Sequence, residues 1–365
     1  MVEDINAVVG GLLRDLALAQ TSQQKMFGYK RAARAVLSLE KPLTELADSN
    51  GAIQKTPGIG PASSRVIREV LETSISPTVE DAVRRSGRTA EIHRRRALRR
   101  TFLSRAEVLR VLGDTSLTGP TKADYHGDLQ MHSEWSDGSS TLETIALAAI
   151  ELGWTFAAVT DHSHGLKIAG GMSMEDAARQ HEAIDGINRT RGGPFRLIKG
   201  IEANIGTDGE LDLSETETAQ VELVLAAPHS KLRLLDTQTA RMLRAIRTPR
   251  VKILAHPRGR ITGSRAGVIA DWDAVFAEAA AMGVAIELDG DPSRQDLDYE
   301  LAARARSVGC LFALDSDAHT TAQFQYVETA LAHARLAGIP PDCVVNCWTT
   351  ERLMAWLSNG RRRQW

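Results

Sequence analysis

The sequence has few cysteines and no long apolar run. Its three cysteines, Cys310, Cys343 and Cys347, form neither a CxxC pair nor a disulfide framework, so we expect them to be reduced, buried and inert. No apolar run approaches the roughly 20 residues that a membrane-spanning helix needs. The opening MVEDINAVVGGLL places acidic residues before its apolar stretch and lacks the pattern of a signal peptide. These absences predict a cytoplasmic chain with no membrane partner.

The chain of 365 residues suits two domains, one of which can be a barrel of about 250 residues. Its charge is unevenly distributed. Residues 1–120 hold 19 Lys and Arg against 13 Asp and Glu, whereas residues 121–365 hold 25 against 33. A basic module suits a polyanion, and an acidic module of this size is either merely soluble or uses some carboxylates to bind cations.

The N-terminal third is expected to be helical. Apolar residues recur at helical spacing over residues 5–39 and again over 62–71, after a Thr-Pro-Gly-Ile-Gly interruption. This pattern predicts a small all-α domain over residues 1–85. Between Arg84 and Arg110 there are ten arginines and two acids, which predicts a basic helical linker over residues 86–120. The alternative is a solvated helix face that binds no partner.

After Pro120, short apolar runs alternate with helical segments in a repeated β-then-α order. Such an order is typical of a parallel sheet covered by helices, and seven units favour a barrel over an open sheet. The sequence therefore predicts an α/β barrel over residues 121–365. The candidate strands cover residues 127–131, 156–160, 196–201, 221–226, 251–255, 284–288 and 311–314.

All but one of these candidate strands are followed by side chains of a metal-binding type. In parallel barrels the carboxyl ends of the strands form one face, so we expect these side chains to meet in one mouth. Imidazole nitrogens and carboxylate oxygens suit zinc, manganese or iron, and the set is too large for one ion. Two or three divalent ions are implied. The expected ligands are Gln130, His132, Asp137, His162, Glu202, His229, His256, Asp317 and His319.

This set of residues favours phosphoester hydrolysis. A carboxylate such as Glu202 or Asp317 can bridge two ions, and ions about 3.5–4 Å apart can bind both the attacking and the leaving oxygen of a phosphoryl transfer. Asp161 lies beside His162 in the sequence. It is expected either to orient a ligating imidazole or simply to cap a strand end.

The motifs GDLQMHSEWSDG, AVTDHSHG, GIEANI, AHP and DSDAH occur in this order and resemble those of the PHP (polymerase and histidinol phosphatase) superfamily. The resemblance covers residues 126–359 and is especially close to the PHP domain of bacterial family X DNA polymerases. It implies a distorted (β/α)7 TIM-like barrel with a trinuclear site, and the same nine ligand positions. The family motif commonly reads His-x-His, and this chain departs from it at Gln130.

The N-terminal third resembles the small helix-hairpin-helix domain of the same polymerases. The stretch TPGIGPASSRVI carries Gly58 and Gly60, which would let the backbone approach a DNA phosphate. The alternative is a glycine turn that joins two core helices. The upstream stretch FGYKRAARAV adds to the resemblance, and Lys25, Lys30 and Arg31 lie on its expected basic face. The implied partner is DNA, bound without regard to its sequence, while protein partners stay unknown.

Two features of those polymerases are missing. Relatives with lyase activity place a Schiff-base lysine six residues after the last hairpin glycine, a position held here by Val66. Between the hairpin and the barrel there is no Gly-Ser followed by paired aspartates on a strand. We therefore expect neither lyase nor polymerase activity.

The sequence thus predicts a metal-dependent phosphoesterase, and the resemblance to the PHP domains of these polymerases implies that it acts on DNA, as a manganese-dependent 3′–5′ exonuclease or a 3′-end-processing enzyme in DNA repair. Glu202, Asp317 and His256 are the expected catalytic residues. Lys231 and Arg258 follow strand ends and are expected either to bind substrate phosphate or to be solvated loop cations. One alternative is a phosphomonoesterase for a small metabolite. Another is a non-catalytic DNA-binding scaffold with structural metals.

Overall fold

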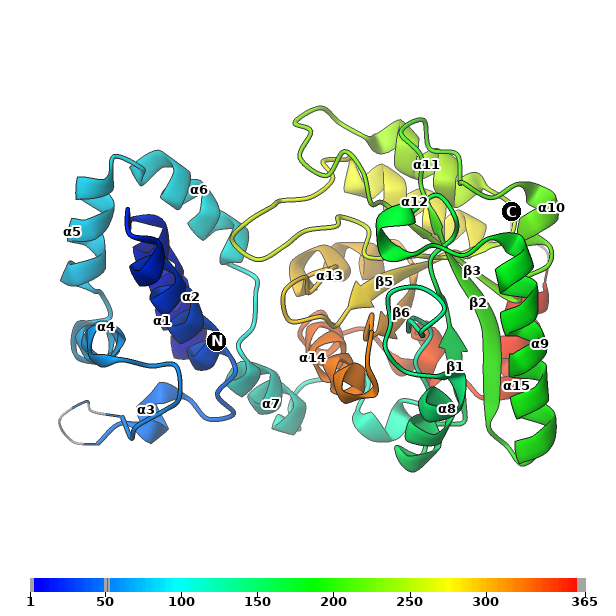
Figure 1. Ribbon diagram of the computed structural model, residues 1–365, viewed down its shortest axis with the longest axis horizontal. Helices are drawn as coiled ribbons and strands as arrows, with labels where there is room; N and C mark the ends of the chain where they lie inside the picture. Colours follow the sequence, from blue (N-terminus) through cyan, green and yellow to red (C-terminus); the bar gives the residue numbers. More distant parts are fainter. Residues whose placement is uncertain (1–2, 49–50, 52, 360–365) are drawn as a thin grey trace. The chain divides into compact units, whose positions relative to one another are not determined.

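The computed structural model describes residues 3–48, 51 and 53–359. Its chain forms two compact units. The first unit comprises Met1–Asp114 together with Thr262–Arg265, and the second comprises Thr115–Ile261 and Ala266–Trp365. We describe each unit separately, as the helical unit and the barrel unit (Figure 1).

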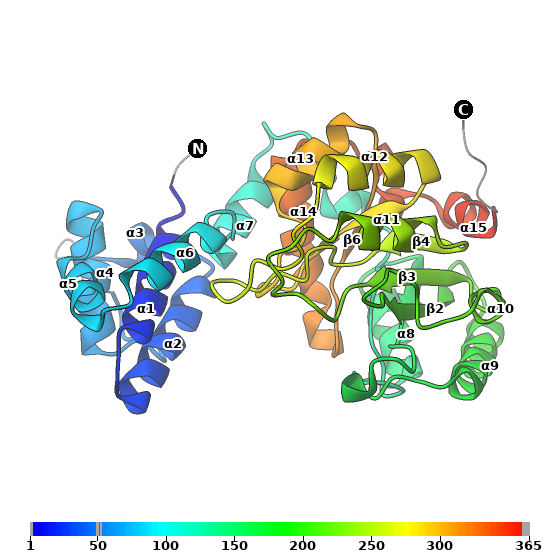
Figure 2. The ribbon, with the colours of Figure 1, turned by 90° about the horizontal axis from the view of Figure 1, so that it is seen from above.

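The helical unit is built around a single apolar core. Val9 and Leu13 of α1, Val36 of α2 and Ile67 of α4 are fully buried in it. Helices α1 and α2 lie side by side (Figure 2). The helices are α1 (Ile5–Leu18), α2 (Gln23–Leu37), α3 (Leu43–Leu46), α4 (Pro61–Thr73), α5 (Pro77–Ser86), α6 (Thr89–Arg99) and α7 (Arg105–Gly113).

Residues 89–113 do not form a separate linker, which corrects the prediction from sequence. They fold as α6 and α7 within the helical unit, and Ile92 of α6 is buried in its core. Asp15 of α1 is fully buried, and it pairs with Arg96 at 2.6 Å and Arg99 at 2.5 Å. A buried carboxylate is costly unless it is paired, so two of the ten arginines have a structural role.

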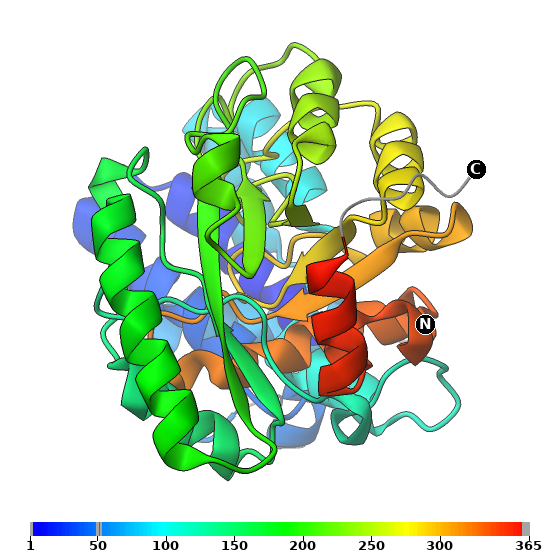
Figure 3. The ribbon, with the colours of Figure 1, turned by 90° about the vertical axis from the view of Figure 1, so that its right-hand side faces the viewer.

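The described part of the barrel unit contains six parallel strands in the order β1-β2-β3-β4-β5-β6 (Figure 3). All residues of β3 are buried, which is expected for a strand covered by helices outside and packed side chains inside. This arrangement confirms the α/β fold class. The strands are β1 (Phe156–Val159), β2 (Arg196–Asn204), β3 (Leu223–Ala227), β4 (Val251–Leu254), β5 (Ala285–Asp289) and β6 (Leu311–Asp315).

The seventh predicted strand, residues 127–131, occupies its expected place without forming a regular strand. The carbonyl of Asp128 accepts a hydrogen bond from the Ala158 amide of β1 at 2.8 Å. On the other side, Met131 forms a parallel bridge with Ala318, which follows β6. The segment therefore lies between the first and last strands. A Cβ at Gly127 would come within 2.0 Å of the Phe156 carbonyl, so this close approach requires glycine.

Helix α15 covers the end of the barrel where the strands begin. Its Leu353 and Leu357 pack into the interior cluster with Phe156, Leu223 and Ala285, which lie at the first residues of three strands. In Figure 3 this helix is drawn in red in front of the strands. Since apolar side chains fill this end of the barrel, a polar site can form only at the opposite end, where the strands finish.

The other helices surround the sheet, and among the described residues no helix is both long and apolar enough to span a membrane. The helices of the barrel unit are α8 (Leu142–Glu151), α9 (Met174–Arg191), α10 (Glu215–Thr218), α11 (Thr239–Arg247), α12 (Trp272–Met282), α13 (Tyr299–Ser307), α14 (Val327–Leu336) and α15 (Thr350–Ser358). Short 3₁₀ turns are η1 (Lys122–Asp124), η2 (Lys167–Ala169), η3 (Thr321–Tyr326), η4 (Pro341–Cys343) and η5 (Val345–Cys347).

Candidate metal centre

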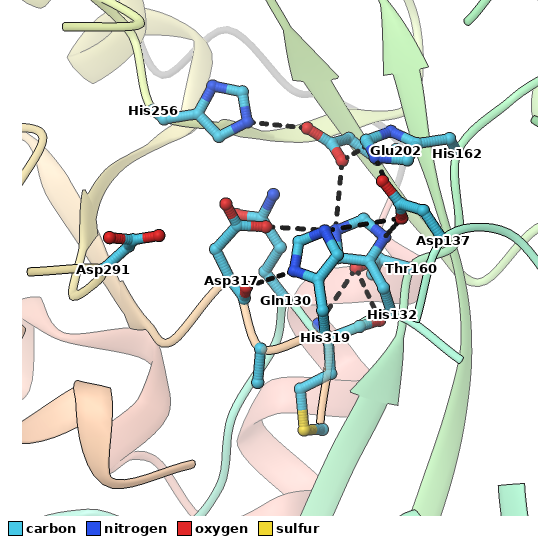
Figure 4. A network of polar contacts seen from close by, with 12 residues as sticks. Gln130, His132, Asp137, Thr160, His162, Glu202, His256, Asp291, Asp317 and His319 are labelled. Atoms are coloured by element: carbon cyan, nitrogen blue, oxygen red, sulfur yellow. Dashed lines mark hydrogen bonds and ion pairs between the residues drawn. The ribbon is translucent and has the colours of Figure 1, made fainter. Parts of the chain in front are cut away.

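The predicted ligands come from one end of the barrel strands, and those labelled in Figure 4 point toward one another. The carboxyl ends of parallel strands share one end of a barrel, which explains why residues far apart in the sequence meet. His132 ends the closing segment, His162 follows β1, Glu202 lies in β2, His229 follows β3, His256 follows β4, and Asp317 and His319 follow β6.

One group of ligand atoms gathers around Asp137, in the loop after His132. Its Oδ1 lies 3.5 Å from Nε2 of His162, 3.4 Å from Nε2 of His319 and 3.8 Å from Nδ1 of His132. The ligand atoms of these four residues all lie within 4.8 Å of one another. Three imidazoles and one carboxylate can hold one divalent ion of the zinc or manganese type.

A second group gathers around the buried carboxylate of Glu202. Its Oε2 lies 3.0 Å from Nδ1 of His162 and 3.4 Å from Nε2 of His132. Its Oε1 lies 2.8 Å from Nε2 of His256 and 3.3 Å from Nε2 of His229. Each oxygen of Glu202 therefore faces two imidazoles, which is the arrangement expected of a carboxylate that bridges two ions.

Asp317 approaches the same cluster from the other side. Its Oδ1 lies 3.1 Å from Nε2 of His132, and its Oδ2 lies 3.1 Å from a guanidinium nitrogen of Arg294. The side chain of Asp317 is almost completely buried. It is thus available both to a metal and to a neighbouring cation.

Gln130 is fully buried beside His132, yet neither of its amide atoms has a hydrogen-bonding partner. A buried polar group without a partner costs about 1–3 kcal/mol and calls for an explanation. A divalent ion that accepted the amide oxygen would provide one. The described side chains therefore fit a metal centre in burial, donor type and unsatisfied polar atoms.

The carboxylates of the cluster are held in their charged form. Burial acts to raise the pKa of Glu202, but His162 and His229 outweigh it and bring the pKa well below its ordinary value. For Asp317 the same effect of burial is outweighed by Arg294 and His132. Burial lowers the pKa of His162, whereas Glu202 and Asp137 raise it, to about 10 overall. The site therefore has a strong affinity for positive charge, which protons or metal ions can supply.

Two imidazoles are oriented by oxygen atoms behind them. Nδ1 of His229 lies 3.2 Å from the side-chain oxygen of Asn204, and Nδ1 of His319 lies 2.8 Å from the Asp317 carbonyl. When Nδ1 carries the proton in such a contact, Nε2 is left with a lone pair for a metal. Sequence reasoning missed Asn204, although the GIEAN motif contains it.

Asp161 orients a loop rather than an imidazole. Its carboxylate accepts hydrogen bonds from the amide and hydroxyl of Ser133, from the hydroxyl of Ser136 and from the amide of Gln180. These contacts hold the loop that carries Asp137. Neither role expected from the sequence, an imidazole partner or a simple strand cap, describes this arrangement.

Arg258, which the sequence predicts to bind substrate, has partners within the barrel unit. Its guanidinium donates to Asp298 at 3.0 Å and to the Ala266 carbonyl at 3.2 Å, so it is engaged in holding loops together. Lys231 is exposed at a positive φ of 58°, and the structure records no side-chain contact for it. Lys231 therefore remains available to a substrate.

Two of the ligands have an unusual backbone conformation. His256 has a φ of 25° and Asp317 a φ of 51°, a region that residues other than glycine rarely adopt. The side chain of the buried Glu287 accepts the backbone N–H of His256 and helps to hold it there. Strained residues of this kind cluster at functional sites.

In the helical unit, the glycine turn lies next to the basic face of α2. Gly58 has a φ of 87°, and a Cβ there would lie 3.5 Å from Cγ of Arg31. Gly60 directly precedes α4. No atom would lie within 4 Å of a Cβ at that position, so there is space beside its backbone for a ligand such as a phosphate. Lys25, Lys30 and Arg31 are all exposed on α2. The position of the relatives' lyase lysine is occupied by the buried Val66.

Residues 128–253 match the family model of the PHP domain. This stretch of the barrel unit is therefore similar to PHP domains. The cluster of candidate metal ligands lies largely within and just beyond the matched residues. The N-terminal third lies outside the match.

Proteins similar to this chain include a polymerase with exonuclease activity in its name and several probable phosphatases. The chain is 34% identical over 232 residues to the DNA polymerase/3′-5′ exonuclease PolX of Bacillus subtilis, a match that spans 63% of this chain and 40% of that protein. It is 29% identical over 245 residues to a probable phosphatase of Syntrophotalea carbinolica, spanning 63% of this chain and 94% of the relative.

A solved structure of histidinol phosphate phosphatase from Lactococcus lactis is 13% identical, with a TM-score of 0.41. It matches 57% of this chain and 94% of that protein.

Proposed function

We propose that this protein hydrolyses phosphoester bonds at the 3′ ends of DNA in the cytoplasm, as a 3′–5′ exonuclease or a 3′-end-processing enzyme of DNA repair. The observation that carries the hydrolytic part is the position of Glu202, whose two oxygens each face two imidazoles at 2.8–3.4 Å. This geometry suits ions that share a carboxylate, and paired ions suit phosphoryl transfer.

The chain's own residues have distinct parts in this reaction. Two or three ions of Mn²⁺, Zn²⁺ or Fe²⁺ would be held by the nine predicted ligands and would supply an activated water and charge neutralisation. Glu202 and Asp317 stay ionised beside their cationic neighbours and bind that positive charge. Nε2 of His256 lies 2.8 Å from Oε1 of Glu202, so the two side chains could hold the same ion.

Features of the helical unit support DNA as the substrate. Lys25, Lys30 and Arg31 form an exposed basic face on α2, and the Gly58 turn lies against Arg31. Contacts of this type bind the phosphate backbone without reading the base sequence. The name of the Bacillus subtilis relative, which includes a 3′–5′ exonuclease, agrees with this proposal, although the match spans only 40% of that protein.

Two loops at the mouth also favour a substrate larger than a phosphomonoester. Ile168 is 96% exposed in the loop after His162, and Leu235 is 87% exposed in the loop after His229. Aliphatic side chains presented in this way can insert between bases at a DNA end. Lys231 lies on the same loop as Leu235 and could meet a phosphate.

The second candidate function is hydrolysis of a small phosphomonoester. It is favoured by the match to the probable phosphatase, of which this chain spans 94%. In that case the basic helical unit would have no part in turnover. A non-catalytic DNA-binding scaffold with structural metals is the third alternative.

One competition experiment separates these functions. The purified, metal-analysed protein is incubated with 3′-labelled DNA in the presence of p-nitrophenyl phosphate or histidinol phosphate. We expect release of label that depends on metal, is abolished in His256→Ala and is preserved in His93→Ala, which changes an exposed histidine of the helical unit. Turnover of the small esters alone would favour the second function, and no turnover of any phosphoester would favour the scaffold.

A further inference from the structure

The strand β5 supplies none of the predicted ligands, but the loop after it brings a cation to the site. Arg294 lies in this loop, and its guanidinium is 3.1 Å from Oδ2 of Asp317 and 3.7 Å from Oδ2 of Asp289. Its ion pair with Asp317 places a cation against a carboxylate of the ligand cluster. Sequence reasoning overlooked it because it lies five residues beyond the end of β5.

The loop is held in place by the two arginines that follow His256. Arg260 donates to the carbonyls of Arg294 at 2.9 Å and Gln295 at 2.6 Å. Both Arg258 and Arg260 donate to Asp298. The segment therefore has a fixed path, and Arg258 and Arg260 hold the loop that carries Arg294.

The opposite side of the loop is fixed by the barrel helices. The side-chain oxygen of Gln295 lies 2.8 Å from Nε2 of the buried His333 on α14. Gln295 also has a positive φ of 46°, so the backbone turns sharply directly after Arg294. These contacts fix the loop so that Arg294 is directed into the site. Little further conformational entropy would therefore be lost if Arg294 bound another group.

The exposure of Arg294 distinguishes it from an arginine with a purely structural role. Arg260 has a side chain that is 4% exposed and is engaged with Asp298 and two carbonyls. The side chain of Arg294 is 27% exposed, although its partners Asp317 and Asp289 are almost fully buried. The Arg294 side chain is thus partly accessible from solvent, while its Nη2 lies 3.1 Å from Asp317.

We infer that Arg294 binds the phosphate of the substrate, donating hydrogen bonds to a non-bridging oxygen while its other edge holds Asp317. The inference rests on the proposed phosphoester hydrolysis. A planar guanidinium suits this task because it can serve a carboxylate and a phosphate at the same time. Arg294 makes and breaks no bond. It neutralises charge on the phosphate and fixes its orientation.

Binding of inorganic phosphate to the metal-loaded protein, measured by calorimetry, tests the inference directly. We expect Arg294→Gln to weaken phosphate binding by at least about tenfold, since a hydrogen bond to a charged group is lost. Metal content per chain should stay that of the parent. Arg304→Gln is the matched control, because Arg304 is an exposed arginine on α13 that pairs with Asp273. Unchanged phosphate affinity in Arg294→Gln would overturn the inference.

A second variant covers the case in which Arg294→Gln loses its metals. Arg294→Lys keeps a cation beside Asp317 but cannot serve two partners with a planar fork. It should retain the metals and still bind phosphate more weakly than the parent. If Arg294→Lys binds metals and phosphate as the parent does, the role of Arg294 is limited to charge balance and the inference fails.

Kinetics provide a readout that a structural role would not change. With p-nitrophenyl phosphate, Arg294→Ala should be partly restored by added guanidinium ion at non-denaturing concentration, whereas Arg304→Ala should not respond. Absence of any restoration, together with parent-like phosphate affinity, would contradict the assignment. If the parent hydrolyses no phosphoester, the calorimetric comparison still decides the role of Arg294, so the two proposals can fail separately.

Discussion

Nδ1 of His229 lies 3.2 Å from the side-chain oxygen of Asn204, the residue that ends β2. This contact fixes the imidazole so that Nε2 faces Glu202 at 3.3 Å. Asn204→Ala should weaken metal affinity by about 10- to 100-fold, as loss of such a partner does in other metal sites. Chelator competition measures the change. Asn204→Asp keeps an acceptor and should restore most of the affinity, and parent-like affinity in Asn204→Ala would show that the contact has no such role.

The charge of Glu202 and Asp317 should be essential to hydrolysis. Glu202→Gln and Asp317→Asn preserve shape but remove a charge that would be shared with metal ions. We expect turnover to fall at least about a hundredfold, which corresponds to about 2.7 kcal/mol of transition-state stabilisation. Circular dichroism should show that both variants fold. Glu210→Gln, which changes an exposed carboxylate of the same unit, should leave turnover unchanged. Activity within about tenfold of the parent would refute the assigned roles.

The ion that Gln130 and His132 would bind should have the lowest affinity of the set. An amide oxygen is a weak and neutral ligand, whereas imidazole is a better donor to zinc. Gln130→His should therefore raise the zinc content per chain and shift the metal preference of hydrolysis away from manganese. Elemental analysis and metal titration check both effects. Gln325→His, at an exposed site, is the control. The same stoichiometry and manganese dependence in Gln130→His and the parent would remove Gln130 from the ligand set.

The basic face of α2 should contribute to DNA binding through phosphate contacts. Replacing Lys25, Lys30 and Arg31 with Gln should weaken binding of a 3′-recessed duplex and lower the slope of log affinity against log salt by about 3, or about 1 for each cation. Fluorescence anisotropy at several salt concentrations measures this slope.

A matched control for this triple variant lies on α9. Arg179, Arg189 and Arg191 are exposed on that helix, and changing them to Gln removes the same number of charges. We expect these changes to leave the salt slope close to that of the parent. Equal slopes for the two triple variants would contradict a specific role of α2.

The exposed aliphatic side chains at the mouth should distinguish DNA from small substrates. The double variant Ile168→Ser and Leu235→Ser should lower kcat/KM on single-stranded 3′ ends by about tenfold, while turnover of p-nitrophenyl phosphate stays unchanged. Leu152→Ser is the control, because Leu152 is exposed at the end of α8, just before the start of β1 and away from the ligands. A parallel loss on both substrates would point to damage of the metal centre instead.

The sequence by itself determined the fold class and which residues could meet. Short apolar runs and a period of 3.6 residues locate strands and helices, and the carboxyl ends of parallel strands necessarily share one end of a barrel. Asp137, Glu202 and five of the histidines are therefore brought together in the structure as expected. Their binding of metal remains a prediction.

Only the tertiary structure decided how the remaining charged groups are used. Arg96 and Arg99 pair with Asp15, more than 80 residues away, and Arg258 pairs with Asp298 instead of facing the ligands. Arg294, from the loop after β5, instead lies 3.1 Å from Asp317. The topology of the barrel fixes where each strand ends. The direction of a loop side chain depends instead on the turns of its own backbone and on partners that are distant in the sequence. Local periodicity encodes neither of these two factors.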